Sequence, residues 1–156
     1  MSEQVKLQRI IQKRPLIIGI GNPLRGDDAA GIEIVKTLHS NGYPHTLIVG
    51  SNPENYLQRI AEMPGEARLW VDIVNFAGEP GSWRIFSRNE IGHFAISTHN
   101  FSLELIFDFL QSLHSVPDFC LGIQPEQTAL GTSLSPIVRK TIKELTQLIV
   151  TTWKNR

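Results

Sequence analysis

Three polar residues from distant parts of the sequence, Asp28, Asp72 and His99, are the candidates for chemistry in this chain. If the apolar runs near them are neighbouring parallel strands, the three side chains meet at the edge where those strands have their carboxyl ends. Two carboxylates and an imidazole form a ligand set that suits a divalent transition metal and leaves coordination positions open. A metal ion held there could polarise a carbonyl oxygen or lower the pKa of a bound water molecule.

Each of these residues also has an ordinary structural explanation. Asp28 could cap the helix that follows it, a role worth about 1 kcal/mol, although Asp27 could cap that helix equally well. Asp72 interrupts the apolar run LWVDIV, where a buried carboxylate is costly unless it is paired, bound to a ligand or at the exposed tip of a strand. His99 could be a hydrogen-bonded loop histidine, since the chain has five histidines. Only the combination points to a site.

The stretch that organises the chain is residues 16–35, LIIGIGNPLRGDDAAGIEIV. Its first residues are continuously apolar, which predicts a strand covered on both faces of a sheet. Gly19 and Gly21 permit a turn, and a helix is expected from Asp28 to about Ser40. Asp28 therefore lies between a buried strand and a helix, at the edge of the sheet where ligands bind in open α/β folds.

Strands and helices alternate along the rest of the sequence. Further strands are predicted at 46–49, 68–74, 82–86 (at an edge) and 118–123, and further helices at 54–63, from about 100–102 with Leu113 facing inward, and from Pro136 after an N-cap at Ser135. This order predicts an α/β fold: a single three-layer domain with a mostly parallel five-stranded sheet and helices on both faces. Residues 1–14 are expected to be a polar lead-in, and residues 87–98 irregular.

The composition limits the classes of function. The 156 residues, 41% of them hydrophobic, suffice for one domain spanning residues 1–156. Fifteen basic and fifteen acidic residues cancel, so no basic face for nucleic acid is expected. No apolar run is long enough for a membrane span, and the charged N-terminus does not resemble a signal peptide. We therefore expect a cytoplasmic, monomeric protein that binds neither nucleic acid nor membranes.

Other chemistries have weaker support. The pair Gly19 and Gly21 is typical of dinucleotide-binding loops, but Leu24 stands where their third glycine would fall. Cys120 lies inside an apolar run, which favours a place in the core over a role as nucleophile. The sequence has no nucleophile elbow and no HExxH motif.

The run GIGNPLRGDDAAG, residues 19–31, resembles the opening motif of the hydrogenase maturation endopeptidases. Further stretches follow in that family's order: SNPEN at 51–55, VD at 71–72 with GEPG at 78–81, STHN at 97–100 and LGIQP at 121–125. The resemblance covers about residues 16–150, and the branch that serves hydrogenase 3 is the most similar. The combination is far more specific than any one of these motifs.

The resemblance implies a peptidase that trims the C-terminal extension from the large-subunit precursor of a nickel-iron hydrogenase. It implies that Asp28, Asp72 and His99 are metal ligands, and that the nickel arrives inside the precursor, although other divalent metals can occupy such a site. Recognition is then their first role and catalysis the second. The peptide bond could be broken by water attacking a metal-polarised carbonyl, or with an Asp as general base.

Two positions depart from the family's pattern. Asn75 stands where many relatives carry an acid, and IVGS at 48–51 stands where many have an Asp-Gly-Gly turn, so altered substrate fit is expected rather than lost metal binding. Two alternative functions remain at this point. One is a hydrolase similar to the peptidyl-tRNA hydrolases, whose opening GIGNP is similar but which need a basic face. The other is a nickel-sensing module that docks on the precursor without cutting it.

Overall fold

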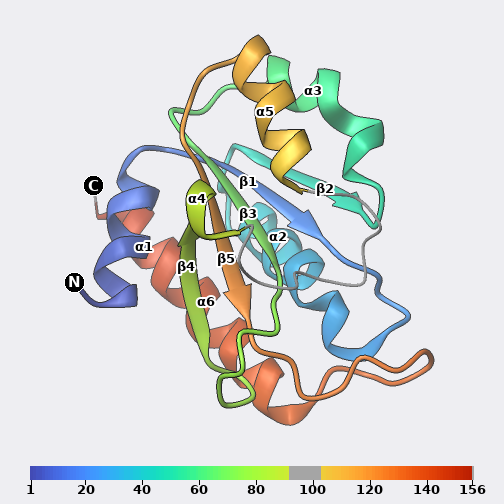
Figure 1. Cartoon of the computed structure of the whole chain (residues 1–156). Helices are drawn as coiled ribbons and strands as arrows, with labels where there is room; N and C mark the ends of the chain where they lie inside the picture. Colours follow the sequence, from blue (N-terminus) through green and yellow to red (C-terminus); the bar gives the residue numbers. More distant parts are fainter. Residues whose placement is uncertain (92–102, 156) are drawn as a thin grey trace.

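The computed structural model describes residues 1–91 and 103–155. They form one five-stranded sheet in the order β2-β1-β3-β5-β4 (Figure 1). The strands are β1 (Leu16–Ile20), β2 (Thr46–Gly50), β3 (Arg68–Ile73), β4 (Trp83–Ser87) and β5 (Asp118–Ile123). All neighbouring strands are parallel except β4, which pairs antiparallel with β5 at one edge. The predicted mostly parallel sheet is confirmed.

Helices cover both faces of this sheet. They are α1 (Glu3–Gln12), α2 (Ala30–Ser40), α3 (Leu57–Glu62), α4 (Arg88–Ile91), α5 (Leu103–Leu113) and α6 (Pro136–Lys154), with 3₁₀ turns η1 (Gly26–Ala29) and η2 (Pro53–Tyr56). The apolar residues of α1, α2 and α6 form one core cluster with one face of the strands. Those of α3, α4 and α5 form the second cluster on the other face (Figure 1). The three predicted layers are present.

Strand β3 shows how the two faces are assigned. Leu69, Val71 and Ile73 belong to the cluster under α1, α2 and α6, whereas Trp70 belongs to the cluster under α3 and α5. This follows from the alternation of side chains along a strand. The same alternation places Asp72 on the face of Trp70. None of the helices in the described part of the chain is long and apolar enough to cross a bilayer.

The expected polar lead-in, residues 1–14, contains helix α1. Leu7, Ile10 and Ile11 of this helix are buried in the core. The Glu3 carboxylate also accepts a hydrogen bond of 2.7 Å from the backbone N–H of Ile85 in β4. Because β4 is an edge strand, this contact satisfies a backbone donor that would otherwise be open to pairing with another chain.

Some helix boundaries and faces differ from the sequence-based expectations. Leu113 was expected to face inward, but it is 49% exposed at the end of α5. Part of the stretch expected to be irregular, residues 87–98, forms β4's last residue and the short helix α4, and residues 92–98 lie outside the described residues. The N-cap of α6 is confirmed, because the Ser135 hydroxyl accepts a hydrogen bond from the Val138 N–H.

A buried ion pair closes the amino end of the sheet. The Arg68 Nε and the Asp118 carboxylate are 2.7 Å apart, at the first residues of β3 and β5. The Trp70 indole N–H and the Gln111 amide donate to the same carboxylate, at 2.9 and 3.0 Å. These contacts give Asp118 an internal structural role, as buried charges require.

Candidate functional site

The two candidate carboxylates lie where the order of the strands reverses direction. The chain passes from β1 to β2 on one side of β1, and then to β3 on its other side. In open α/β sheets, ligands bind outside the carboxyl ends of the strands at such a point. Asp28 lies in η1, after β1, and Asp72 is the penultimate residue of β3. The predicted position of both residues at this edge is confirmed.

Asp28 is 1% exposed, and its Oδ2 accepts a hydrogen bond of 3.0 Å from the backbone N–H of Asn22. The helix that follows has Ala29 as its N-cap residue, and no side chain makes a capping hydrogen bond to η1 or to α2. The interpretation of Asp28 or Asp27 as the cap of this helix is therefore wrong. Asp28 instead holds the turn that leaves β1.

Asp27 has a different role from its neighbour. Its carboxylate accepts hydrogen bonds from the backbone N–H groups of Glu126 and Gln127, at 2.8 and 3.0 Å. It also accepts hydrogen bonds from the backbone N–H and the hydroxyl of Ser135, at 2.7 and 2.9 Å. Asp27 thus anchors the loop between β5 and α6, a role that requires contacts too distant in sequence for any local motif to indicate.

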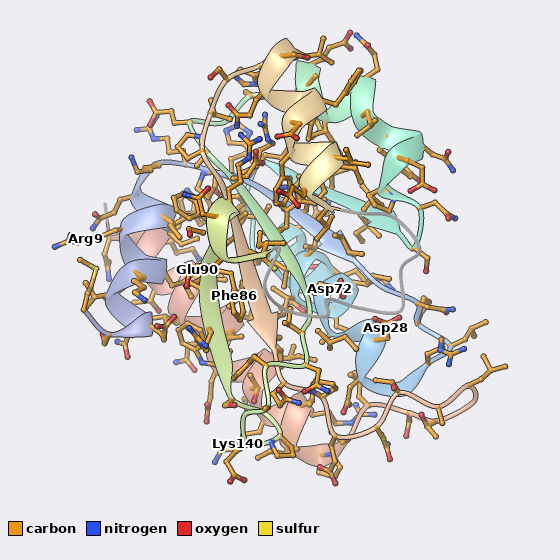
Figure 2. All side chains as sticks on the ribbon, viewed as in Figure 1. Arg9, Asp28, Asp72, Phe86, Glu90 and Lys140 are labelled. Atoms are coloured by element: carbon orange, nitrogen blue, oxygen red, sulfur yellow. The ribbon has the colours of Figure 1, made fainter. Side chains whose placement is uncertain are left out.

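Gly31 brings the start of α2 against the ends of β1 and β3. A Cβ atom at Gly31 would lie 2.2 Å from the carbonyl oxygen of Val71 and 2.7 Å from that of Ile20. Backbone oxygens cannot move aside, so only glycine allows this approach. Val71 directly precedes Asp72, and Asp28 lies one turn before Gly31. The close approach therefore holds both carboxylates at the same end of the sheet, where they are labelled in Figure 2.

Asp72 is fully buried, and its Oδ1 accepts a hydrogen bond of 2.8 Å from the backbone N–H of Ile73. Its charge acts on Cys120, which lies on the neighbouring strand β5. Burial, and to a lesser extent the negative charge of Asp72, raise the pKa of the Cys120 thiol. Because the thiolate is the nucleophilic form, Cys120 is a neutral core residue, and the prediction that it packs in the core is confirmed.

Asn75 and Gln124 join the loop after β3 to the end of β5. The Asn75 Oδ1 accepts hydrogen bonds from the Ala77 N–H at 3.1 Å and from the Gln124 side-chain amide at 3.2 Å. The Gln124 Oε1 accepts hydrogen bonds from the N–H groups of Phe76 and Gly78, at 2.9 and 3.1 Å. These hydrogen bonds fix the loop after β3 against the end of β5, and no local sequence pattern indicates them.

The third candidate, His99, lies outside the described residues. Within residues 1–91 and 103–155, no three His, Cys, Asp or Glu side chains are grouped closely enough to hold a metal ion. The described part of the site is therefore a pair of buried carboxylates from two elements. Carboxylate oxygens are suitable ligands for a divalent metal, and His99 follows in the sequence as the nitrogen donor of the predicted set.

Comparison with known proteins identifies the family. The family model described as HycI, hydrogenase maturation protease, matches residues 32–152. The chain belongs to the hydrogenase maturation protease family. A "Putative hydrogenase maturation protease" of Methanocaldococcus jannaschii is 30% identical over 126 residues, which are 73% of each chain. A second one from this organism is 27% identical over 150 residues, covering 89% of this protease and 96% of the relative.

Solved structures agree with this assignment. The crystal structure of the [NiFe] hydrogenase maturation protease HycI from Thermococcus kodakarensis superposes with a TM-score of 0.86 at 29% identity, covering 96% of this chain and 99% of that one. The solution structure of the endopeptidase HycI from Escherichia coli has the same fold, with a TM-score of 0.76 at 24% identity over 90% of each chain. This hydrogenase maturation protease is therefore a peptidase, as the resemblance implied.

Proposed function

We propose that this protease removes the C-terminal extension of a nickel-iron hydrogenase large-subunit precursor after nickel has been inserted. The observation that carries the proposal is the pair of buried carboxylates, Asp28 and Asp72, at the switch point between β1 and β3. Asp28 makes no capping hydrogen bond to the helix that follows it, so its place at this edge is not explained by capping. Family membership supports the substrate class.

In this proposal, the nickel is part of the substrate. Asp28, Asp72 and His99 contact the ion in the precursor and so position the scissile bond at the edge of the sheet. Two negatively charged carboxylates attract a cation, and this attraction is stronger in the buried site than in water because the effective dielectric constant is lower. A water molecule then hydrolyses the scissile peptide bond, with the ion polarising the carbonyl or with one carboxylate as general base. We expect this processing in the cytoplasm by a monomeric enzyme.

The decisive experiment uses purified protease with the nickel-loaded and the nickel-free precursor, followed by intact mass spectrometry. We expect loss of a C-terminal peptide from the nickel-loaded precursor alone. Equal cleavage of both precursors would contradict recognition through nickel. Stable binding without cleavage would favour the module that docks without cutting. Hydrolysis of a peptidyl-tRNA to peptide and free tRNA would favour the other hydrolase, which family membership and the neutral charge already disfavour.

Single substitutions test the contribution of each candidate residue to processing. Asp28→Asn and Asp72→Asn each preserve the size of the side chain and remove its charge, so we expect processing to slow by about 10- to 100-fold. His99→Gln tests the nitrogen donor in the same assay. Asp108, an exposed acid on α5, provides the matched control as Asp108→Asn. Unchanged processing by all three site variants would overturn the assignment of the site.

A further inference from the structure

The two edges of the sheet differ in how their backbone groups are covered. At the β4 edge, the Glu3 carboxylate accepts a hydrogen bond from the Ile85 N–H, and helix α1 contacts the strand. At the other edge, β2 pairs with β1 alone among the described strands (Figure 1). An edge strand without such cover is a template on which an extended chain can add as a further strand.

The outer side of β2 carries unused backbone donors and acceptors. The His45 carbonyl accepts a hydrogen bond of 2.9 Å from the Ile17 N–H of β1. Backbone groups of successive residues in a strand point to opposite sides, so the N–H and C=O groups of Thr46 and Ile48 point away from β1. No hydrogen bond within residues 1–91 and 103–155 uses these outward groups. Ile48 is also 36% exposed, so solvent reaches this edge.

This edge lies in a groove between α2 and the segment from η2 to α3. The groove has a volume of about 530 Å³. Lys36 and His39 of α2 line one side of it, Tyr56 and Arg59 line the other, and residues 46–48 of β2 lie between them. Such a groove suits an extended peptide, because the peptide backbone pairs with the strand while alternate side chains face the two walls.

The charges of the walls favour an acidic peptide. No Asp or Glu is among the described residues that line the groove, whereas Lys36 and Arg59 both line it. Lys36 has an ion pair of 3.8 Å with Glu33, and Arg59 forms none within the described part of the chain. The two cations attract a carboxylate on a bound peptide. They disfavour a second copy of this chain, because two β2 edges side by side would bring like charges together.

The groove leads to the candidate site through the last residue of β2. The Gly21 N–H donates to the Gly50 carbonyl at 3.0 Å, and the Ser51 hydroxyl donates to the Gly21 carbonyl at 3.3 Å. Gly21 in turn lies against Asp28, since a Cβ atom at Gly21 would be 1.9 Å from the Asp28 carbonyl oxygen and 3.7 Å from its Oδ1. A strand added outside β2 would be two strand spacings, about 10 Å, from β1. About three extended residues span that distance.

We infer that the outer edge of β2 binds the C-terminal extension of the precursor as an added antiparallel strand, an inference that rests on the proposed function. The scissile bond is placed at the carboxyl end of β1 and β3, beside Asp28 and Asp72, and the extension begins after that bond. From there it runs toward the amino end of β2, which makes it antiparallel to this strand. Three residues that cross to β2 and three that pair with residues 46–48 require an extension of at least about six residues. Lys36 and Arg59 favour extensions with an acidic side chain in the paired segment.

The first test blocks the edge of β2 without removing a hydrogen bond to β1. Ile48→Pro removes an outward N–H, a position at which an edge strand tolerates proline. Ile48→Val keeps this N–H and is the matched control. We expect Ile48→Pro to raise the KM for the nickel-loaded precursor about tenfold with kcat unchanged, as the loss of one or two backbone hydrogen bonds implies. Ile48→Val should leave KM within about twofold of the wild-type value.

The second test removes the charges of the walls. Arg59→Gln and Lys36→Gln should each raise KM by about three- to tenfold, and by less in about 0.5 M salt, which screens the attraction. Lys140→Gln is the control, because Lys140 is an exposed lysine of α6 outside the groove. It should leave KM unchanged.

A synthetic peptide of the extension tests the binding mode without any change in the protein. Methylation of one backbone nitrogen at a time should raise the dissociation constant about tenfold at every second residue of the paired segment. At the residues between, the change should be less than about twofold, because their N–H groups point away from β2. Equal effects at all positions, or no measurable binding of the unmethylated peptide, would overturn the inference.

The outcomes separate this inference from the proposed function. If the wild-type protease cuts the nickel-loaded precursor while Ile48→Pro and Arg59→Gln keep its KM, the inference is overturned and the proposed function stands. If the wild type cuts no precursor while the extension peptide binds with the alternating pattern, the proposed function fails and the binding site stands. A dimer in solution that Ile48→Pro converts to a monomer would assign the edge to a second copy of the chain and overturn the inference.

Discussion

The Asp27 carboxylate accepts two hydrogen bonds from Ser135, one from its backbone N–H at 2.7 Å and one from its hydroxyl at 2.9 Å, across 108 residues of sequence. Ser135 is also the N-cap of α6, so this contact ties the start of the last helix to the turn after the first strand. The adjacent residue, Asp28, accepts a hydrogen bond from the backbone N–H of Asn22, in the turn that follows β1. Two neighbouring carboxylates therefore serve different purposes.

Asp27→Asn should chiefly lower the stability of the protein, whereas Asp28→Asn should chiefly lower its activity. Asn at position 27 turns an NH₂ group toward donors that need an acceptor, so we expect the free energy of unfolding to fall by about 3 kcal/mol. Asn at position 28 retains an oxygen for the Asn22 N–H, so stability should change by less than about 1 kcal/mol while processing slows by about 10- to 100-fold. Urea unfolding and the processing assay give both quantities. The reverse pattern would contradict this division of roles.

Gly31→Ala tests the contact that holds α2 against the strands. The new Cβ would lie 2.2 Å from the Val71 carbonyl oxygen, so α2 must shift away from β1 and β3. We expect a loss of about 3 kcal/mol in the free energy of unfolding, at the upper end for overpacking. Gly131→Ala is the control, because nothing lies within 4 Å of its Cβ and only its φ of +84° is unfavourable, by about 1 kcal/mol. Equal effects of the two substitutions would refute the explanation.

The sequence predicted the sheet well because its buried strands are continuous apolar runs with glycine or proline nearby. β3 and β5 are of this kind, and their parallel pairing follows from the helices between the strands. Helix α1 was missed, because three buried residues, Leu7, Ile10 and Ile11, are surrounded by polar ones and show their role only against a sheet. Leu113 has helical spacing, but it lies at the end of α5, beyond the core.

The candidate site was predictable only in part. Asp28 and Asp72 could be placed, because both follow from the rule that parallel strands end at one edge. The role of Asp27 could not, because its partners lie 99 to 108 residues away and come together only in the folded chain. The Asn75 and Gln124 pair was missed for the same reason. His99 stays a prediction from the sequence.

Asn75→Asp should be tolerated, although Asn75 replaces an acid that many relatives carry. Both hydrogen bonds of the Asn75 side chain are accepted by Oδ1, and a carboxylate provides the same acceptor. We therefore expect kcat/KM to stay within about twofold of the wild-type value. The melting temperature should change by no more than about a few degrees. Gln124→Ala serves as contrast, because it leaves the Phe76 and Gly78 N–H groups without their acceptor and should lower the unfolding free energy by about 2 kcal/mol. A large loss of activity in Asn75→Asp would mean that the amide nitrogen contacts the substrate.

Cys120 should make the stability of the protein sensitive to alkaline pH. Its pKa is raised above the ordinary value of 9.0, chiefly by burial and further by the charge of Asp72. Below about pH 9 the thiol is protonated in both the folded and the unfolded chain, so it does not make the free energy of unfolding depend on pH. Above that pH the unfolded chain loses the proton while the folded chain keeps it, so the free energy of unfolding falls by about 1.4 kcal/mol per pH unit.

Cys120→Ala removes this titration and leaves the other alkaline groups in place. The difference in unfolding free energy between the wild type and Cys120→Ala should therefore be constant up to about pH 9 and then shrink as the pH rises. Urea unfolding of both proteins from pH 7 to 10.5 measures that difference directly. A difference that stays constant over the whole range would mean that the thiol ionises in the folded protein as readily as in the unfolded chain. Cys120 would then be open to water, and rapid alkylation of the native protein by iodoacetamide would report the same exposure.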